Sequence, residues 1–390
     1  MQLVQQLLEE NILAFWINNM QDHERGGFYG QIDGKGVLQP KASKGAVLNA
    51  RILWTFSAAY RLLKLPKYLD MAERAFNYIR TFFIDPVYDG IYWELDCMGN
   101  PLNTKKQTYA QGFALYGFTE FYRATGNEQA LELAKRFFFL LEKYQDRVNG
   151  GYFEAFTHDW QPIEDMRLSN RDANEKKTMN THLHVLEPYS NLLRIWRSPQ
   201  LENAQRKLLA IFIDRILNPQ THHLELFFDE RWTPKSTAIS FGHDIEASWL
   251  LYEAAEALGD AALTEKITAI SLQIADAAAE GFQADGSMIY ETDGQHTDFD
   301  RHWWVQAETV VGYLYAWRNS GNVAYKEKAE RTAQYIRKKI VDWENGEWYW
   351  SRKDNGSVNC SDDKAGFWKC PYHNGRMCME IISQKFNITI

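Results

Sequence analysis

The sequence lacks any uninterrupted run of about 18 apolar residues, so it contains no candidate transmembrane helix. It also lacks a block of five or more like charges, and its 43 basic and 51 acidic side chains give a net charge of −8. No feature therefore predicts binding to nucleic acid or to an anionic membrane surface, and we expect a neutral or weakly charged ligand. The first 20 residues carry Glu9 and Glu10 within an apolar pattern and resemble no secretion signal.

Glycine, with 24 residues, and proline, with 10, are scarce, whereas aromatic residues make up 14% of the chain. Such a composition excludes a disordered or collagen-like protein. Cysteine is scarce too, and Cys97, Cys360, Cys370 and Cys378 have the spacing of neither a zinc module nor a disulfide scaffold. We therefore predict a reduced, cytoplasmic protein that binds no metal.

A short turn followed by aromatic, strand-like residues recurs six times along the 390 residues. The turns are 60 to 73 residues apart and are marked by Gly27, Gly90, Gly151, Leu224, Gly286 and Gly346. A Gly next to Asp, Asn or a second Gly, followed by strand-like residues, is typical of a tight hairpin. The fourth copy lacks its glycine and is the weakest. Each repeat leaves room for two helices.

Two kinds of helix alternate between the turns. Residues 46–63 and 111–122 are apolar on almost every side, which is typical of helices that are packed all round, whereas residues 262–276 have a single apolar stripe. We expect inner helices to begin near residues 44, 107, 180, 243, 302 and 373, and outer helices near residues 3, 66, 128, 200, 262 and 322. Twelve helices in six hairpin-linked pairs predict an all-α fold, an (α/α)6 barrel, as a single domain over residues 1–390. All six inner helices then have their N-termini at one end.

Polar and aromatic side chains in the first turns of the inner helices should therefore converge on one cavity. Three pairs share a helical face by their spacing, namely Asn180 with His184, His243 with Glu246, and Trp304 with Glu308. A carboxylate one turn from an imidazole can fix the tautomer of the histidine and raise its basicity, although such a pair can also be a simple helix-stabilising ion pair. Indole rings at a cavity mouth suit the faces of a pyranose sugar. We assign no chemistry to His182, His223 or His302.

Four motifs carry a resemblance to a known family: RILW at 51–54, GHDIEASWLL at 242–251, WWVQAE at 303–308 and WKCPYHNGRMCME at 368–380. Over essentially the whole chain they resemble the N-acylglucosamine 2-epimerase family, and within it the members that act on disaccharides. The resemblance implies an (α/α)6 barrel that epimerises the reducing-end glucose of β-1,4-linked disaccharides or oligosaccharides, such as cellobiose or lactose, to mannose. It implies no cofactor. We further expect a monomer that binds neither nucleic acid nor membrane.

The resemblance also implies roles for individual residues. His243 and His373 would be the two acid/base residues, Arg51 would contact the reacting oxygens, and His184 with Glu246 would support ring opening and histidine positioning. The residues expected to hold the sugar are Tyr109, Asn180, Trp303, Trp304, Glu308 and Trp368.

Other activities fit parts of the pattern. An N-acylglucosamine or monosaccharide 2-epimerase, or an aldose–ketose isomerase, would use the same histidines. A glycoside hydrolase with this barrel would instead need two carboxylates about 5–9.5 Å apart, for which Glu246 and Glu308 are the candidates. A non-catalytic sugar-binding protein would not need an arginine and two histidines together. A metal held by His184, His243, Glu246 and His373 has no support from a local ligand pair.

Overall fold

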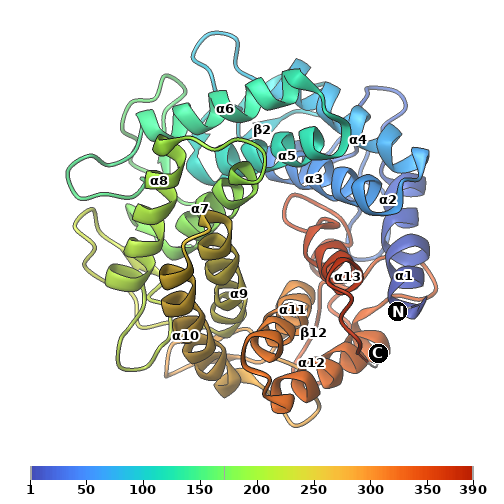
Figure 1. The fold of residues 1–390 in the computed structure, drawn as a ribbon. Coiled ribbons are helices and arrows are strands. Elements are labelled where there is room, and N and C mark those ends of the chain that lie inside the picture. The colour runs from blue at the N-terminus through green and yellow to red at the C-terminus, as the bar shows by residue number, and fades with distance from the viewer. Residues whose placement is uncertain (1, 171, 389–390) are drawn as a thin grey trace.

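The computed structural model describes residues 2–170 and 172–388, which fold into two concentric rings of helices (Figure 1). The inner ring consists of α3 (Ala46–Leu63), α5 (Thr108–Thr125), α7 (Met179–Leu193), α9 (Phe241–Leu258), α11 (Trp303–Ser320) and α13 (Tyr372–Ser383). The outer ring consists of α1 (Gln2–Gln6) with α2 (Ala14–Asn19), then α4 (Pro66–Tyr78), α6 (Glu128–Lys143), α8 (Pro199–Ile211), α10 (Ala261–Ala278) and α12 (Val323–Tyr335). The predicted (α/α)6 barrel is confirmed.

Several outer helices contain a π-helical segment or end in a π-helical or 3-10 segment. A π-helical segment, η1 (Leu7–Leu13), joins α1 to α2, so that the three form one continuous outer helix. Further π-helical turns, η2 (Ile79–Phe83), η3 (Phe212–Ile216) and η5 (Ile336–Ile340), follow α4, α8 and α12, and a 3-10 turn, η4 (Ala279–Gly281), follows α10. With η1 counted as part of the first outer helix, the described residues form six inner and six outer helices, as the repeat predicts.

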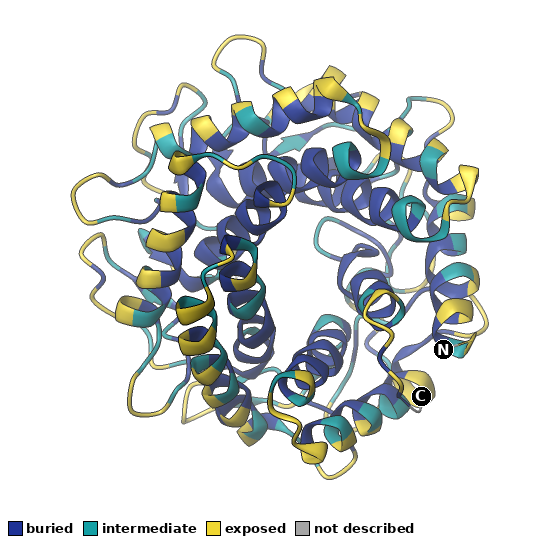
Figure 2. Ribbon diagram, viewed as in Figure 1, coloured by how far each residue is buried: buried dark blue, intermediate teal, exposed yellow. Residues whose placement is uncertain are grey.

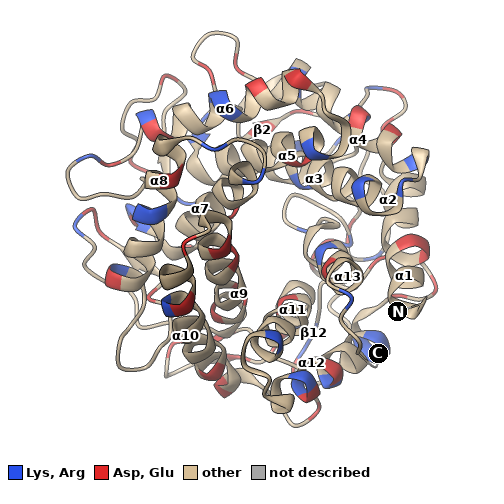
Figure 3. Ribbon diagram, in the orientation of Figure 1, with Lys and Arg blue, Asp and Glu red and all other residues tan. Residues whose placement is uncertain are grey.

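The two rings differ in burial as their sequences predict. Helices of the inner ring are buried on nearly every side, whereas those of the outer ring expose one face (Figure 2). Most charged residues lie on the outer helices and the loops (Figure 3). The ring closes where the first outer helix packs on α13, and here Trp16 Nε1 donates to Glu347 at 2.7 Å.

Very short turns connect inner helices to outer ones. Gly126, Gly259 and Gly321 each end an inner helix in the left-handed conformation, with φ of 71–72°. The residue that follows each glycine is Asn127, Asp260 or Asn322, and its side chain accepts a backbone N–H of the next outer helix. Glycine tolerates the positive φ and Asn or Asp caps the new helix, so two residues suffice to reverse the chain.

Six antiparallel bridges form at the predicted turns, which confirms the hairpins: Gln21 with Phe28, Ile84 with Ile91, Gln145 with Tyr152, Leu217 with Leu224, Phe282 with Met288, and Val341 with Trp348. In the fourth turn, which lacks glycine, His222 takes the left-handed conformation at φ 61°.

Short strands connect neighbouring repeats. The strands are β1 (Lys44–Gly45), β2 (Glu94–Leu95), β3 (Pro101–Asn103), β4 (Lys106–Gln107), β5 (Ala155–Phe156), β6 (Lys177–Thr178), β7 (Phe227–Phe228), β8 (Ile239–Ser240), β9 (Glu291–Thr292), β10 (Thr297–Asp298), β11 (Arg301–His302) and β12 (Ser351–Arg352). Five of them precede an inner helix directly, and each of these pairs with a strand that follows the next turn, as β1 does with β2. A bridge from Ile32 to Ala365 joins the first repeat to the last. These pairings hold the six helix N-termini in a ring.

Buried lysine–aspartate pairs brace four of the six turns. Asp85 is typical: its carboxylate accepts Lys106 Nζ at 2.6 Å and the backbone N–H groups of Val87 and Tyr88. The other three pairs are Lys44 with Asp22, Lys177 with Asp146, and Lys364 with Asp342. Lys44, Lys106 and Lys177 lie two residues before α3, α5 and α7, so these three lysines tie inner-helix entrances to turns.

Replacing Asp85 with Asn should destabilise the protein strongly at neutral pH and less in acid. Burial alone would raise the pKa of Asp85, but the hydrogen bonds from Lys106, Val87 and Tyr88 lower it to about 2. The stabilisation is therefore complete above the ordinary pKa near 3.8 and is lost as the pH falls through about 2. Removing one partner of a buried pair costs about 3–5 kcal/mol.

Urea unfolding of D85N and wild type between pH 7 and pH 2.5 measures this effect. Glu132→Gln is the matched control because Glu132 pairs with Lys135 on the surface, with its side chain 70% exposed, where a pair contributes about 1 kcal/mol or less. A difference between D85N and wild type that stays constant down to the lowest pH would contradict the assignment.

Candidate active site

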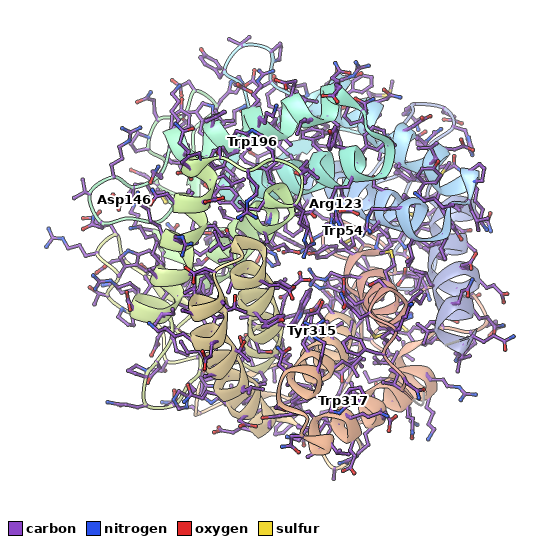
Figure 4. All side chains as sticks on the ribbon, viewed as in Figure 1. Trp54, Arg123, Asp146, Trp196, Tyr315 and Trp317 are labelled. Atoms are coloured by element: carbon purple, nitrogen blue, oxygen red, sulfur yellow. The ribbon has the colours of Figure 1, made fainter. Side chains whose placement is uncertain are left out.

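A cavity of about 840 Å³ opens at the N-terminal ends of the inner helices. It is lined by ten of the eleven residues predicted from the sequence: Arg51, Tyr109, Asn180, His184, His243, Glu246, Trp303, Trp304, Trp368 and His373. A second cavity of only about 30 Å³ lies toward the C-terminal ends of the same helices. Trp54 of α3 and Arg123 of α5, which line it, are labelled at the inner ring of helices in Figure 4.

His373, on the first turn of α13, is held by a carboxylate of the neighbouring helix α11. Its Nδ1 lies 2.7 Å from Glu308 Oε1. The other Glu308 oxygen accepts Trp249 Nε1 at 3.0 Å. Both oxygens are thus engaged behind the cavity wall, so Glu308, predicted to hold the sugar, is the one predicted residue that does not line the cavity. Burial lowers the pKa of His373 to about 3 although Glu308 opposes the shift, so the imidazole is neutral.

His243, on the first turn of α9, has a different partner from the predicted one. Its Nδ1 lies 2.7 Å from the hydroxyl of Ser240, the residue that precedes α9. Glu246 instead accepts Nη2 of Arg376 at 2.9 Å and lies 3.8 Å from Nδ1 of His373. The predicted pairing of His243 with Glu246 is therefore wrong, because a guanidinium binds the carboxylate. Burial, together with His184, lowers the pKa of His243 to about 3.

Trp304 lies between the two histidines. Its ring centroid is 4.8 Å from that of His243 and 5.6 Å from that of His373. The sequence spacing predicts that Trp304 and Glu308 share one face of α11. In the structure both side chains contact His373. Two neutral imidazoles with engaged Nδ1 atoms thus flank one indole at the base of the cavity.

His184, on α7, pairs with Glu187 and not with Glu246. Its Nδ1 lies 2.7 Å from Glu187 Oε2, three residues further along the same helix. Burial, followed by the charges of Arg51 and Arg376, lowers the pKa of His184 well below its usual range. The sequence has the required i, i+3 spacing, but Glu187 was not singled out, since the resemblance directed attention to Glu246.

Arg51 lies in the cavity wall without a carboxylate partner. Its Nη2 donates to the Tyr109 hydroxyl at 2.9 Å, and its guanidinium packs 4.3 Å from the centre of the Phe113 ring. Nε has no hydrogen-bond acceptor among the described residues. A buried cation of this kind is costly unless a ligand uses it.

Arg376 connects the carboxylates behind the cavity. Its Nη2 donates to Glu246 at 2.9 Å and to Glu308 at 2.7 Å, and its Nη1 donates to Glu187. Glu246, Glu308 and His373 would otherwise have the spacing of a metal site. Since the guanidinium already supplies the positive charge between the two carboxylates, this arrangement does not favour a cation there. Arg376 belongs to the last sequence motif, which indicated that it lies near the mouth but gave it no role.

The cavity rim is built from equivalent positions of the repeats. Two residues after the bridged residues Tyr152, Met288 and Trp348 of the turns lie Glu154, Tyr290 and Trp350, and all three line the cavity. Trp93, the equivalent residue of the second repeat, packs on Trp368 with ring centroids 5.9 Å apart. The hairpins therefore supply the outer wall and the helices supply the base.

His182, to which the sequence assigns no chemistry, uses both ring nitrogens within the protein, on Thr178 and Tyr152.

The chain belongs to the N-acylglucosamine 2-epimerase family, because residues 27–374 match the model of that family. The cellobiose 2-epimerase of Bacteroides fragilis is 52% identical over 387 residues, which cover 98% of each chain. That of Ruminococcus albus is 38% identical over 386 residues and 99% of each chain. The solved structure of cellobiose 2-epimerase from Bacillus thermoamylovorans superposes with a TM-score of 0.94 at 38% identity, covering 98% of each chain. The resemblance inferred from the motifs is confirmed, and the chain is a carbohydrate epimerase by class.

Among the described residues, no helix is both long enough and apolar enough to cross a membrane.

Proposed function

We propose that this enzyme reversibly epimerises the reducing-end glucose of cellobiose and related β-1,4-linked disaccharides or oligosaccharides at C2, giving mannose. The observation that carries the proposal is the pair His243 and His373 on either side of Trp304, in a cavity of about 840 Å³. Inverting a carbon requires proton removal on one face and delivery on the other, which takes two groups. Full-length similarity to proteins named cellobiose 2-epimerase supports the substrate.

The proposed reaction begins with ring opening of the hemiacetal, assisted by His184. One of the two C2 histidines then removes the C2 proton from the open-chain aldose to give a planar enediolate. Arg51, which stays charged, stabilises the enediolate oxygen without competing for the proton. The other histidine delivers a proton to the opposite face. Each step moves only protons and electron pairs, so the reaction requires no cofactor.

The different partners of the two histidines give the proposal a direction. His373 has the carboxylate of Glu308 at Nδ1, whereas His243 has the neutral hydroxyl of Ser240. A carboxylate stabilises an imidazolium and a hydroxyl does not, so we infer that an imidazolium formed during turnover is more stable on His373 than on His243. In the direction from glucose to mannose, His243 then removes the C2 proton and His373 delivers one, and the roles are exchanged in the reverse direction.

Turnover of cellobiose in D2O tests the proposed function. The expected product is glucosyl-mannose with deuterium at C2. An unlabelled product would overturn C2 proton abstraction. A glucosyl-ketose as the main product would identify an aldose–ketose isomerase, and free glucose a hydrolase. The geometry does not favour hydrolysis, since Glu246 and Glu308 are both bound by the guanidinium of Arg376.

Three finer points belong to the same proposal. Lactose should also be a substrate, because it differs from cellobiose only in the sugar remote from the reacting carbon. The chain should act as a monomer, since one chain supplies the base and rim of the cavity; light scattering of the active enzyme checks this. A cytoplasmic location, predicted from the cysteines, is checked by cell fractionation.

A further inference from the structure

We propose that Glu187 is a positioning residue that makes His184 a dedicated base for opening the sugar ring, separate from the C2 chemistry. The proposal rests on the proposed function. Glu187 and His184 lie three residues apart on α7, and both are nearly fully buried. Nδ1 of His184 is 2.7 Å from Glu187 Oε2. With Nδ1–H donated to the carboxylate, only Nε2 of His184 is left to act as a base in the cavity.

Glu187 acts through His184, because it does not itself line the cavity. Its second oxygen, Oε1, accepts hydrogen bonds from the Arg376 guanidinium and from the Tyr372 hydroxyl. Two donors on Oε1 and one on Oε2 require an acceptor at each oxygen, so the carboxylate cannot turn away from His184. Arg376 supplies the opposite charge that balances it.

The backbone and ring of His184 are also fixed. Its ring packs against Tyr109 and Phe113, each with centroids 5.0 Å apart. Pro188, four residues later within α7, cannot donate to the His184 carbonyl. That carbonyl instead faces Gly112 of α5 so closely that a Cβ there would lie 2.5 Å from the oxygen. His184 therefore presents Nε2 in one orientation.

Ring opening suits one such base and needs no further reactant. Nε2 takes the proton of the C1 hydroxyl, the C1–O5 bond breaks as the C1 carbonyl forms, and the imidazolium returns the proton to O5. The substrate changes from hemiacetal to hydroxyaldehyde with no net gain or loss of protons. The Glu187 carboxylate stabilises the transient imidazolium of His184. Glu187 is the partner of neither His243 nor His373.

Glu187→Gln is the informative variant because it keeps the shape of the side chain and reverses the tautomer of His184. The Arg376 guanidinium can only donate to the side-chain atom at this position, so the amide oxygen must stay on its side. The amide NH2 then points at Nδ1 of His184, which must become the acceptor, and Nε2 carries the proton. An equivalent change of tautomer in a serine protease triad costs about 10⁴-fold in kcat. For E187Q we expect kcat on cellobiose to fall by about 10²-fold or more.

A cellobiose analogue that lacks O5 on the reducing residue separates ring opening from epimerisation. O4 of that residue is in the glycosidic bond, so without O5 neither a furanose nor a pyranose can form, and no such ring has to be opened. E187Q should turn over this analogue at nearly the wild-type rate while failing on cellobiose. His184→Asn should show the same difference between substrates, and the double variant should be no worse than either single one.

Glu120→Gln is the matched control. Glu120 is a fully buried carboxylate of α5 that pairs with Arg61 and Arg123 away from the cavity. Its loss should lower stability without distinguishing the two substrates. Equal loss of activity of E187Q on cellobiose and on the analogue would overturn the proposal, as would wild-type activity on both. Should E187Q not fold, Glu187→Asp carries the same comparison. If wild type epimerises neither substrate, the proposed function itself fails, which is a different result.

Discussion

Replacing His243 or His373 with Asn is expected to lower the rate of epimerisation by about 10²–10⁴-fold while leaving each variant able to exchange one proton. In the proposed mechanism each histidine acts on one side of C2, so the variant that keeps it can still remove and return the proton of the epimer presenting hydrogen on that side. The two variants should therefore be complementary. One exchanges deuterium into cellobiose but not into glucosyl-mannose, and the other does the reverse. Proton NMR of both sugars in D2O measures the exchange.

The control for these variants is His296→Asn, because His296 is exposed and away from the cavity. It should retain wild-type rates of both inversion and exchange. Loss of all exchange in both His243→Asn and His373→Asn would show that the histidines act together as a unit. Exchange into both epimers by one variant would mean that a single base reaches both faces, and the two-histidine mechanism would be wrong.

The barrel could be predicted from the sequence because its signals are local and repeated. A helix packed all round, a helix with one apolar stripe and a glycine turn can each be recognised within about 20 residues, and six copies at 60 to 73 residues reinforce one another. The Gly-Asn and Gly-Asp pairs after α5, α9 and α11 belong to the same local class. What could not be predicted is the pairing between β1 and β2 and its equivalents, since two-residue strands have too few residues to show alternation.

The site, like the fold, could be predicted from the sequence only in part. Convergence of ten residues on one cavity follows from helix direction alone. The partners of the histidines do not, because they are decided by contacts between helices. Helical spacing assigned Glu246 to His243, yet Arg376 of α13 binds Glu246, and Glu308 of α11 reaches His373 of α13. The one pair within a helix, His184 with Glu187, had the same kind of spacing as the wrong pair. Spacing therefore gives candidates, and charges from other helices decide among them.

Arg51→Met is expected to lower kcat by about 10²–10³-fold and yet leave the protein about as stable as wild type. None of the ion pairs among the described residues includes Arg51, and its Nε has no acceptor. Arg51 forms no ion pair with a carboxylate, although Tyr109, Cys370, Glu246 and Glu187 together offset the burial of its charge. An apolar side chain of similar length should therefore fit the site at little cost in stability. In the proposed mechanism the enediolate supplies the negative charge that the guanidinium lacks.

Thermal unfolding and steady-state kinetics of R51M, with Arg123→Met as the control, separate the two effects. Arg123 donates to Glu120 and to Asn191, each at 2.7 Å, so its loss leaves a buried carboxylate less well paired. R123M should unfold at a lower temperature and keep its kcat, whereas R51M should do the opposite. A loss of stability in R51M with an unchanged kcat would make Arg51 a structural residue, since a group that stabilises the enediolate cannot be removed without slowing its formation.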